Sequence, residues 1–292
     1  MLGRRQKWDK VAIIFILPWF IFFCSFTFYP VFTALLVSTN EWNLFEGTFR
    51  WIGFSQYLKL FHDAKFYQCL WNNFVYLGIQ VPLSIFGGIL IAVLLNQKVK
   101  GRIFFRGIFF LPIITGIVVL VIIWSWMFSA GGGVINYFLG KVHLPPVPWL
   151  IDPRWSMPSI ALMKVWTDVA FYGVLFLGAL QGIPQSLFEV AKIDGASQWH
   201  IFWSITLPLL NPAIVFAVIM GTIWGMQIFT EPLLMTEGGP LGSSTPLTLF
   251  LYRQGFTWGR YSYACAIGIV TSLLILLFSI IERKFIERVT LY

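Results

Sequence analysis

The chain has 292 residues, of which 58% are hydrophobic and only 11% are charged, and its formal net charge is +8. Because a soluble domain carries roughly 25% charged residues, this composition excludes an ordinary soluble protein. Membrane topology explains the positive charge better than nucleic-acid binding does. We therefore expect membrane lipid, and no nucleic acid, around this chain.

Six apolar runs are long enough to cross a membrane, since about 20 helical residues span the hydrocarbon core. They cover residues 11–37, 72–95, 104–128, 158–182, 207–230 and 262–281. Lipid offers no partner for free backbone groups, so these runs predict an all-α polytopic membrane protein with six transmembrane helices. The first run is too long for a secretory signal and no small-residue cleavage site follows it, so we expect a retained helix.

The distribution of basic residues predicts the orientation. With the N-terminus in the cytoplasm, the inner segments hold 12 Lys and Arg residues and the longer outer segments hold 8. Cytoplasmic loops of membrane proteins are enriched in these residues. Both termini are therefore predicted to be cytoplasmic.

Polar residues in the fourth and fifth runs mark a candidate path for a solute. Lys164 and Asp168 are four residues apart, so they share a helical face and can pair. Ionisable groups within a membrane are costly and usually face a bundle interior or a water-filled path. The candidate path residues are Lys164, Trp166, Asp168, Trp224, Gln227 and Glu231. The alternative is that these polar side chains only hold helices together.

A polar elbow, residues 184–206, separates the fourth and fifth runs. Ser186 and Glu189 match a capping box, which predicts a helix start. Gly195 follows Asp194 and predicts a helix end, and Ser197 is placed to cap a second short helix. Aromatic residues then recur at helical spacing. The pattern predicts a cytoplasmic docking element, although a plain helical hairpin in which Glu189 only caps would carry the same signals.

The stretch from Glu189 to Pro208 resembles the Glu-Ala-Ala loop of permease subunits in binding-protein-dependent ABC importers. The matching residues are Glu189, Ala191, Asp194, Gly195, Ala196, Phe202, Ile205, Leu207 and Pro208, and the one departure is Val190 in place of alanine. Further segments resemble the carbohydrate branch, which includes maltose and glycerol-phosphate permeases. They are PWLIDP (148–153), LQGIP (180–184), TEGGP (236–240) and YSYACA (261–266).

The resemblance implies a type I ABC importer permease fold and an ATP-driven sugar transporter in a bacterial or archaeal plasma membrane. It implies an N-terminal region over 1–71, a permease core over 72–282 and a cytoplasmic tail over 283–292. It assigns ATPase coupling to Glu189, Ala191, Asp194, Gly195, Phe202 and Pro208. The implied partners are a second, different permease, two ATPase subunits and an external solute-binding protein.

Two other function classes compete with the importer. A transporter driven by an ion gradient also fits six spans with intramembrane charges, but it leaves the elbow unexplained. An integral membrane enzyme has no supporting motif. Gly140-Lys141 is followed by Val142, so no phosphate-binding loop is present, and ATP and Mg²⁺ are expected only in partner subunits. Three Cys and three His residues are too scattered to predict a metal site. The sugar stays open between a monosaccharide, an oligosaccharide and a glycerol phosphate ester.

Overall fold

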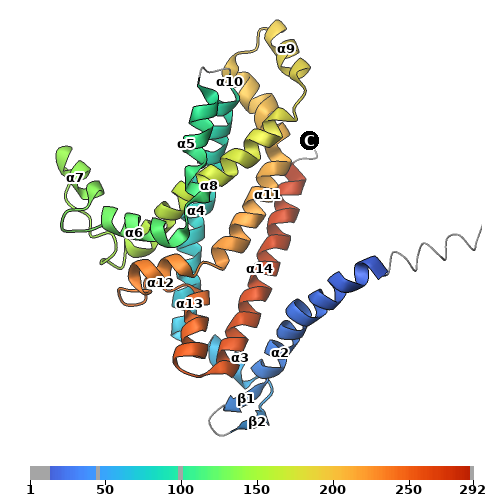
Figure 1. Ribbon diagram of the computed structural model, residues 1–292, viewed down its shortest axis with the longest axis vertical. Coiled ribbons are helices and arrows are strands. Elements are labelled where there is room, and N and C mark those ends of the chain that lie inside the picture. Colours follow the sequence, from blue (N-terminus) through green and yellow to red (C-terminus); the bar gives the residue numbers. More distant parts are fainter. Residues whose placement is uncertain (1–13, 44–46, 98–100, 290–292) are drawn as a thin grey trace, which may run out of the picture. The chain divides into compact units, whose positions relative to one another are not determined.

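Long helices dominate the computed structural model, which describes residues 14–43, 47–97 and 101–289 (Figure 1). Within these residues, five helices are long and apolar enough to cross a membrane, or six spans are present if one bent pair counts as a span. The five are Ile14–Ser38, Ala64–Asn96, Ser156–Gln181, Gln198–Met226 and Tyr261–Lys284. The predicted helical membrane architecture is confirmed, although Ala64–Asn96 and Gln198–Met226 begin well before the apolar runs 72–95 and 207–230.

The third predicted span is not one straight helix. Helix α5 (Arg102–Ile114) is followed by Thr115 and Gly116, and α6 (Ile117–Met127) then continues at a bend of 103°. Pro112 has no backbone N–H to donate, and Gly116 has an extended backbone with φ −60° and ψ 136°. The uniform apolar run over 104–128 predicts a continuous helix, and these two residues are why that prediction is wrong.

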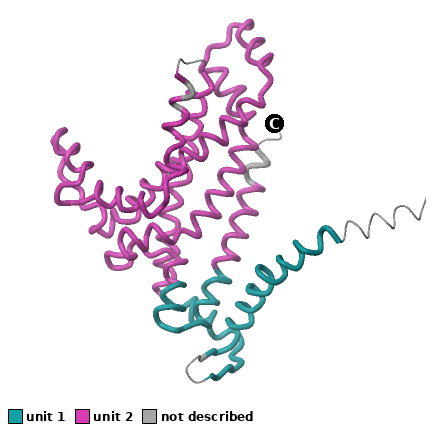
Figure 2. The backbone as a smooth tube through the Cα atoms, in the orientation of Figure 1, with its two compact units in different colours: residues 1–63, 251–270 teal, residues 64–250, 271–292 magenta. Residues whose placement is uncertain are grey.

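The chain divides into two compact units, and residues 1–63 and 251–270 form the first (Figure 2). Its elements are η1 (Cys24–Phe28), α2 (Tyr29–Ser38), β1 (Asn40–Asn43), β2 (Thr48–Trp51), α3 (Ser55–Phe61), η3 (Arg253–Thr257) and the first part of α14 (Tyr261–Val289). Strands β1 and β2 pair antiparallel, with Glu41 opposite Arg50. The strict all-α prediction missed this hairpin, in which Gly47 has a φ of +62°.

The second unit comprises residues 64–250 and 271–292. Its elements are α4 (Ala64–Asn96), α5, α6, α7 (Val134–Lys141), α8 (Ser156–Gln181), α9 (Gln185–Ile193), α10 (Gln198–Ile201), η2 (Phe202–Thr206), α11 (Leu207–Met226), α12 (Thr230–Thr236) and α13 (Leu247–Tyr252), with the last part of α14. Buried side chains of α4, α8 and α11, among them Tyr172, Phe176 and Leu210, form one hydrophobic core.

Helices α4 and α8 approach closely because glycine lies between them. A Cβ atom on Gly88 would lie 2.6 Å from the Cβ of Tyr172, and one on Gly87 would lie 2.6 Å from a methyl group of Val169. Small residues allow membrane helices to pack backbone against backbone. This contact fixes α4 against α8 and so positions the polar side chains that the two helices carry one to two turns away.

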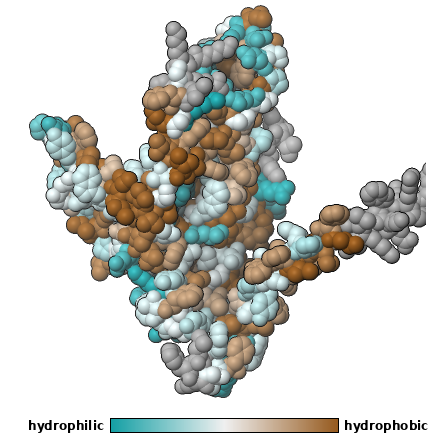
Figure 3. Space-filling model, in the orientation of Figure 1, coloured by the Kyte–Doolittle hydropathy of each residue, from teal (hydrophilic) through white to brown (hydrophobic). Residues whose placement is uncertain are grey.

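The elbow lies at one end of the second unit, beyond the ends of α8 and α11 (Figure 1). Hydrophilic residues gather at this end, whereas broad hydrophobic areas lie over α5 and α6 (Figure 3). This distribution is expected where the apolar helices face lipid and the elbow faces water.

Candidate functional site

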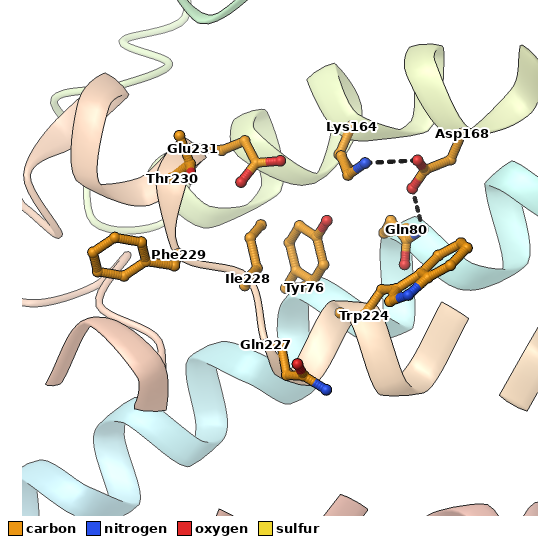
Figure 4. Close-up of a pocket in the computed structure, with 11 residues that line it drawn as sticks. Tyr76, Gln80, Lys164, Asp168, Trp224, Gln227, Ile228, Phe229, Thr230 and Glu231 are labelled. Carbon is orange, nitrogen blue, oxygen red and sulfur yellow. Dashed lines mark hydrogen bonds and ion pairs between the residues drawn. The ribbon is translucent and has the colours of Figure 1, made fainter. Parts of the chain in front are cut away.

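Polar side chains of α4, α8 and the segment after α11 line a cavity of about 180 Å³ (Figure 4). Eleven residues line it: Tyr76, Gln80, Lys164, Asp168, Trp224, Gly225, Gln227, Ile228, Phe229, Thr230 and Glu231. The helices bring together residues that are as far apart in sequence as Tyr76 and Glu231. All of them belong to the second unit.

A hydrogen-bonded ion pair forms the polar centre of the cavity. The Lys164 ammonium donates to Asp168 Oδ1 at 2.7 Å, and the Gln80 amide donates to Asp168 Oδ2 at 2.6 Å. The expected i,i+4 pair is therefore present, and Gln80 on α4 adds a second donor that ties α4 to α8. Asp168 is 8% exposed, so its charge depends on these two partners. These two hydrogen bonds stabilise the buried charge of Asp168, which still lines the cavity.

Aromatic rings cover the other side of this network. Trp224 is half exposed in the cavity, and its ring meets the edge of Phe171 at a centroid distance of 5.4 Å. Tyr76, which also lines the cavity, is fully buried. Trp166, which was expected on the path, does not line the cavity. Its side chain points toward Trp124 instead, with ring centroids 6.0 Å apart, because residues 164 and 166 lie on different faces of α8.

Glu231 lies in the first turn of α12, outside the candidate spans. It is only 7% exposed, and burial raises the pKa of its carboxyl group, while its own backbone hydrogen bond and the Lys164 ammonium act in the opposite direction. Gln227 directly follows α11, and its side chain is exposed and lines the cavity. Five of the six residues proposed for the path, all except Trp166, thus line one cavity.

Sequence reasoning missed the residues that α4 contributes. Gln80 is the one amide after Asn72 and Asn73 in the apolar run over 72–95, at the spacing of one helical turn from Tyr76. The spacing of Gln80 and Tyr76 on one helical face was the available signal, since an amide inside a membrane span needs a hydrogen-bond partner. The partner itself, Asp168, lies 88 residues further along the chain and could not be identified from spacing.

The elbow is the short helix α9, a tight turn, and α10, which continues through η2 into the long helix α11. Helix α9 ends at Ile193, Gly195 has a φ of +79°, and the Gly195 and Ala196 amides donate to the carbonyl groups of Lys192 and Ala191 at 3.1 and 2.9 Å. This is a Schellman motif, in which glycine takes the left-handed position. The predicted helix stop at Gly195 is present.

The start of α9 differs from the prediction. The helix begins at Gln185 with Pro184 in the capping position, and no side chain caps it. Ser186 therefore lies inside the first turn, so the predicted capping box with Glu189 is wrong. The second predicted cap is present, since Ser197 Oγ accepts a hydrogen bond from the His200 amide at 3.2 Å.

Exposed apolar side chains follow one face of α9. Leu187, Val190 and Ile193 recur at intervals of three residues, and Ile193 is 83% exposed. Of the residues in α9, only Ala191 is buried, while Glu189 and Asp194 are exposed. On the next helices, Trp199 is also exposed, whereas Phe202 is partly buried. The elbow thus presents an apolar face and acidic groups together, and Pro208 lies beyond it in the first turn of α11.

A family model described as the binding-protein-dependent transport system inner membrane component matches residues 84–291. The chain belongs to this family. The lactose transport system permease protein LacF of Rhizobium radiobacter is 32% identical over 95% of this chain and 94% of its own length. The trehalose/maltose transport system permease protein MalF of Thermococcus litoralis is 31% identical over 96% of this chain and 95% of its own.

A solved structure has the same fold along nearly the whole chain. The crystal structure of a bacterial ABC transporter involved in the import of the acidic polysaccharide alginate matches with a TM-score of 0.84 and 25% identity, covering 99% of both chains. The type I ABC importer permease fold is therefore confirmed. Family membership also confirms a transport subunit of the inner membrane rather than an enzyme.

Proposed function

We propose that this chain is one of two different permease subunits in an ATP-driven importer of a carbohydrate. The observation that carries the proposal is the elbow, whose exposed apolar face on α9 needs a partner. An exposed face of this kind, at the end of the unit away from the hydrophobic areas, fits a groove in a water-soluble subunit. Family membership supports an ATPase subunit as that partner.

In this proposal, residues 184–206 dock onto a cytoplasmic ATPase subunit. The Schellman turn at Gly195 fixes the angle between α9 and α10, and Glu189 faces a basic residue of the partner. Closure of two ATPase subunits, which bind ATP and Mg²⁺, moves the elbow and the ends of α8 and α11 that flank it. Ala191, Asp194, Phe202 and Pro208 maintain the elbow rather than contact a solute. Both termini of the chain lie in the cytoplasm.

Carbohydrate is proposed as the substrate class on two grounds. The relatives above are named for lactose and for trehalose and maltose. The cavity sets amide and carboxylate groups beside the half-exposed Trp224 ring, and sugars offer hydroxyl groups to the former and C–H faces to the latter. An external solute-binding protein delivers the substrate to this path. Lys164, Asp168, Trp224, Gln227 and Glu231 form this chain's share of it.

The test is a pull-down of the chain from its native membranes in mild detergent, with co-purifying proteins identified by mass spectrometry. We expect an ATPase subunit and a second permease with the unaltered chain. Both Glu189→Lys and Gly195→Pro should lose the ATPase and keep the second permease. The first reverses the charge that is proposed to face a basic residue of the ATPase, and the second breaks the turn, because proline cannot adopt a φ of +79°. Glu41→Lys, a charge reversal on the exposed β1 strand, is the control and should lose neither.

If no ATPase co-purifies and both elbow variants behave like the parent, the docking proposal is wrong. A transporter driven by an ion gradient, with Lys164 and Asp168 at its centre, would then be the explanation to pursue.

A further inference from the structure

The cavity carries three charged groups, and their sum is not positive. Lys164 supplies the single cation, while Asp168 and Glu231 supply two carboxylates. Figure 4 shows the three along one side of the cavity, on α8 and α12. Protonation of the buried Glu231 would leave a neutral site, and its ionisation would leave one net negative charge.

The cation is also already compensated. Lys164 Nζ lies 2.7 Å from Asp168 Oδ1, and the other oxygen of this carboxylate accepts from Gln80. An anionic ligand at Lys164 would either share the ammonium group with the adjacent Asp168 carboxylate, and be repelled by it, or displace Asp168 and leave a buried carboxylate without its partner. That exchange is unfavourable, because an unpaired buried charge costs far more than a surface one.

A buried acceptor of the cavity has no hydrogen-bond partner. Gln80 is 3% exposed, and its Oε1 atom receives no hydrogen bond, while its Nε2 is used by Asp168. Figure 4 places this amide between Asp168 and the Trp224 ring. A free acceptor calls for a donor, and a sugar hydroxyl supplies one. A carboxylate, a sulfate ester or a fully ionised phosphate ester placed at this atom has no hydrogen to donate to it.

We infer that this cavity selects uncharged saccharides and rejects uronates, sulfated sugars and sugar phosphates. The inference rests on the proposed function, since it assumes that the cavity is on the carbohydrate path. The fold does not decide the point, because the alginate importer shares the fold and serves an acidic polysaccharide. The decision lies with the Lys164, Asp168, Glu231 and Gln80 side chains. A cavity with this selectivity excludes the glycerol phosphate ester as a substrate, which the sequence left open.

The experiment measures direct binding to the purified complex of both permeases and the ATPase subunits in nanodiscs, without the solute-binding protein. Omitting that protein removes its own selectivity from the result. The probes are neutral mono- to tetrasaccharides, each paired with its counterpart oxidised to a uronate at one C6, together with glycerol 3-phosphate. Ligand-observed saturation-transfer NMR gives the affinity of each, and uptake of the same panel is measured with the complete importer in proteoliposomes.

At neutral pH, we expect at least about a tenfold preference for the neutral member of each pair that binds, since a like charge near a partly buried site is costly. In the double variant with Asp168→Asn and Glu231→Gln, Lys164 is the one remaining charge. The preference of this variant for neutral saccharides over uronates should fall at least about tenfold, because it gains uronate binding. Asp152→Asn is the control, because Asp152 pairs with the exposed Arg154 outside the cavity and should not change the preference.

The outcomes separate the two claims. Uronates bound as tightly as their neutral partners by the parent would overturn the inference and leave the carbohydrate path standing. A folded double variant with the parent's preference would also overturn it. If no saccharide of either kind is bound or imported, the carbohydrate function itself fails. The binding preference of the parent is measured on the unaltered chain, so the inference stays testable if the double variant does not fold.

Discussion

The elbow and the cavity are built in opposite ways. The elbow is one continuous segment, and its geometry follows from neighbours such as Gly195, whose amide bonds three residues back. The cavity joins side chains from α4, α8, α11 and α12 and from the residues between the last two, and its central hydrogen bond links residues 88 positions apart. The elbow therefore depends on local backbone preferences, while the cavity depends on how the helices pack.

This contrast predicts different consequences for variants. Changes in the packing that holds the cavity should destabilise the second unit. Changes in the elbow should leave its core intact and act on the docking of a partner. Four variants test the contrast, starting with the largest expected effect.

Gly88→Val should be the most damaging substitution. Its Cβ would lie 2.6 Å from the Cβ of Tyr172 and 3.0 Å from the backbone of the same residue, so α4 and α8 would have to separate. We expect a loss of about 3 kcal/mol in stability, the upper part of the range for overpacked cores. The measurement is the thermal midpoint of the purified complex by size-exclusion chromatography.

Gly78→Val is the matched control for this variant. It lies on the same helix, but a Cβ there meets no atom within 4 Å, so its midpoint should match the parent. Equal midpoints for the two variants would show that α4 and α8 do not approach at Gly88.

Asp168→Ala should act on the cavity itself. It removes the partner of Lys164 and leaves the Gln80 amide without its acceptor, which costs about 2 kcal/mol. We expect sugar uptake into proteoliposomes to fall at least about tenfold while ATPase binding is unchanged. Asp152→Ala, which breaks an exposed pair, is the control and should transport normally. Lost assembly of Asp168→Ala would instead support a role as helix–helix glue.

The fold could be predicted wherever the signal was local. Apolar runs identified the spans, and Gly195 and Ser197 identified the turn and a cap, because each acts on its own neighbours. The bend after α5 and the β1–β2 hairpin were missed, since apolar content outweighed Pro112 and Gly116 and no alternation marked the strands. The capping-box prediction at Ser186 was wrong because the helix begins at Gln185, two residues earlier than the motif implies.

The site could be predicted only in part. Charged and amide groups stand out in an apolar chain, so Lys164, Asp168 and Glu231 were identified. Tyr76 and Gln80 were not, because the face of α4 that meets α8 is decided by glycine contacts rather than by composition. Trp166 was misplaced because its two-residue offset from Lys164 puts it on another face of the helix.

Gly195→Ala should weaken the elbow moderately. Alanine at a φ of +79° costs about 1 kcal/mol, so the turn between α9 and α10 would open in part of the population. We expect weaker ATPase co-purification with an unchanged thermal midpoint. Gly178→Ala on α8 is the control, since a Cβ there meets open space and its backbone is helical. A lowered midpoint for Gly195→Ala would show that the elbow is part of the core.

Ser197→Ala should have the smallest effect and separates a true cap from an apparent one. It removes the hydroxyl that accepts from the His200 amide, an exposed bond worth about 0.5 kcal/mol. We expect a two- to threefold loss of ATPase affinity. About 1.4 kcal/mol corresponds to a tenfold change in affinity, so about 0.5 kcal/mol corresponds to this smaller ratio. Ser186→Ala is the matched control, because α9 begins without a side-chain cap and should be unaffected. An equal loss in both variants would restore Ser186 as a cap, while a loss in neither would show that docking orders α10 without Ser197.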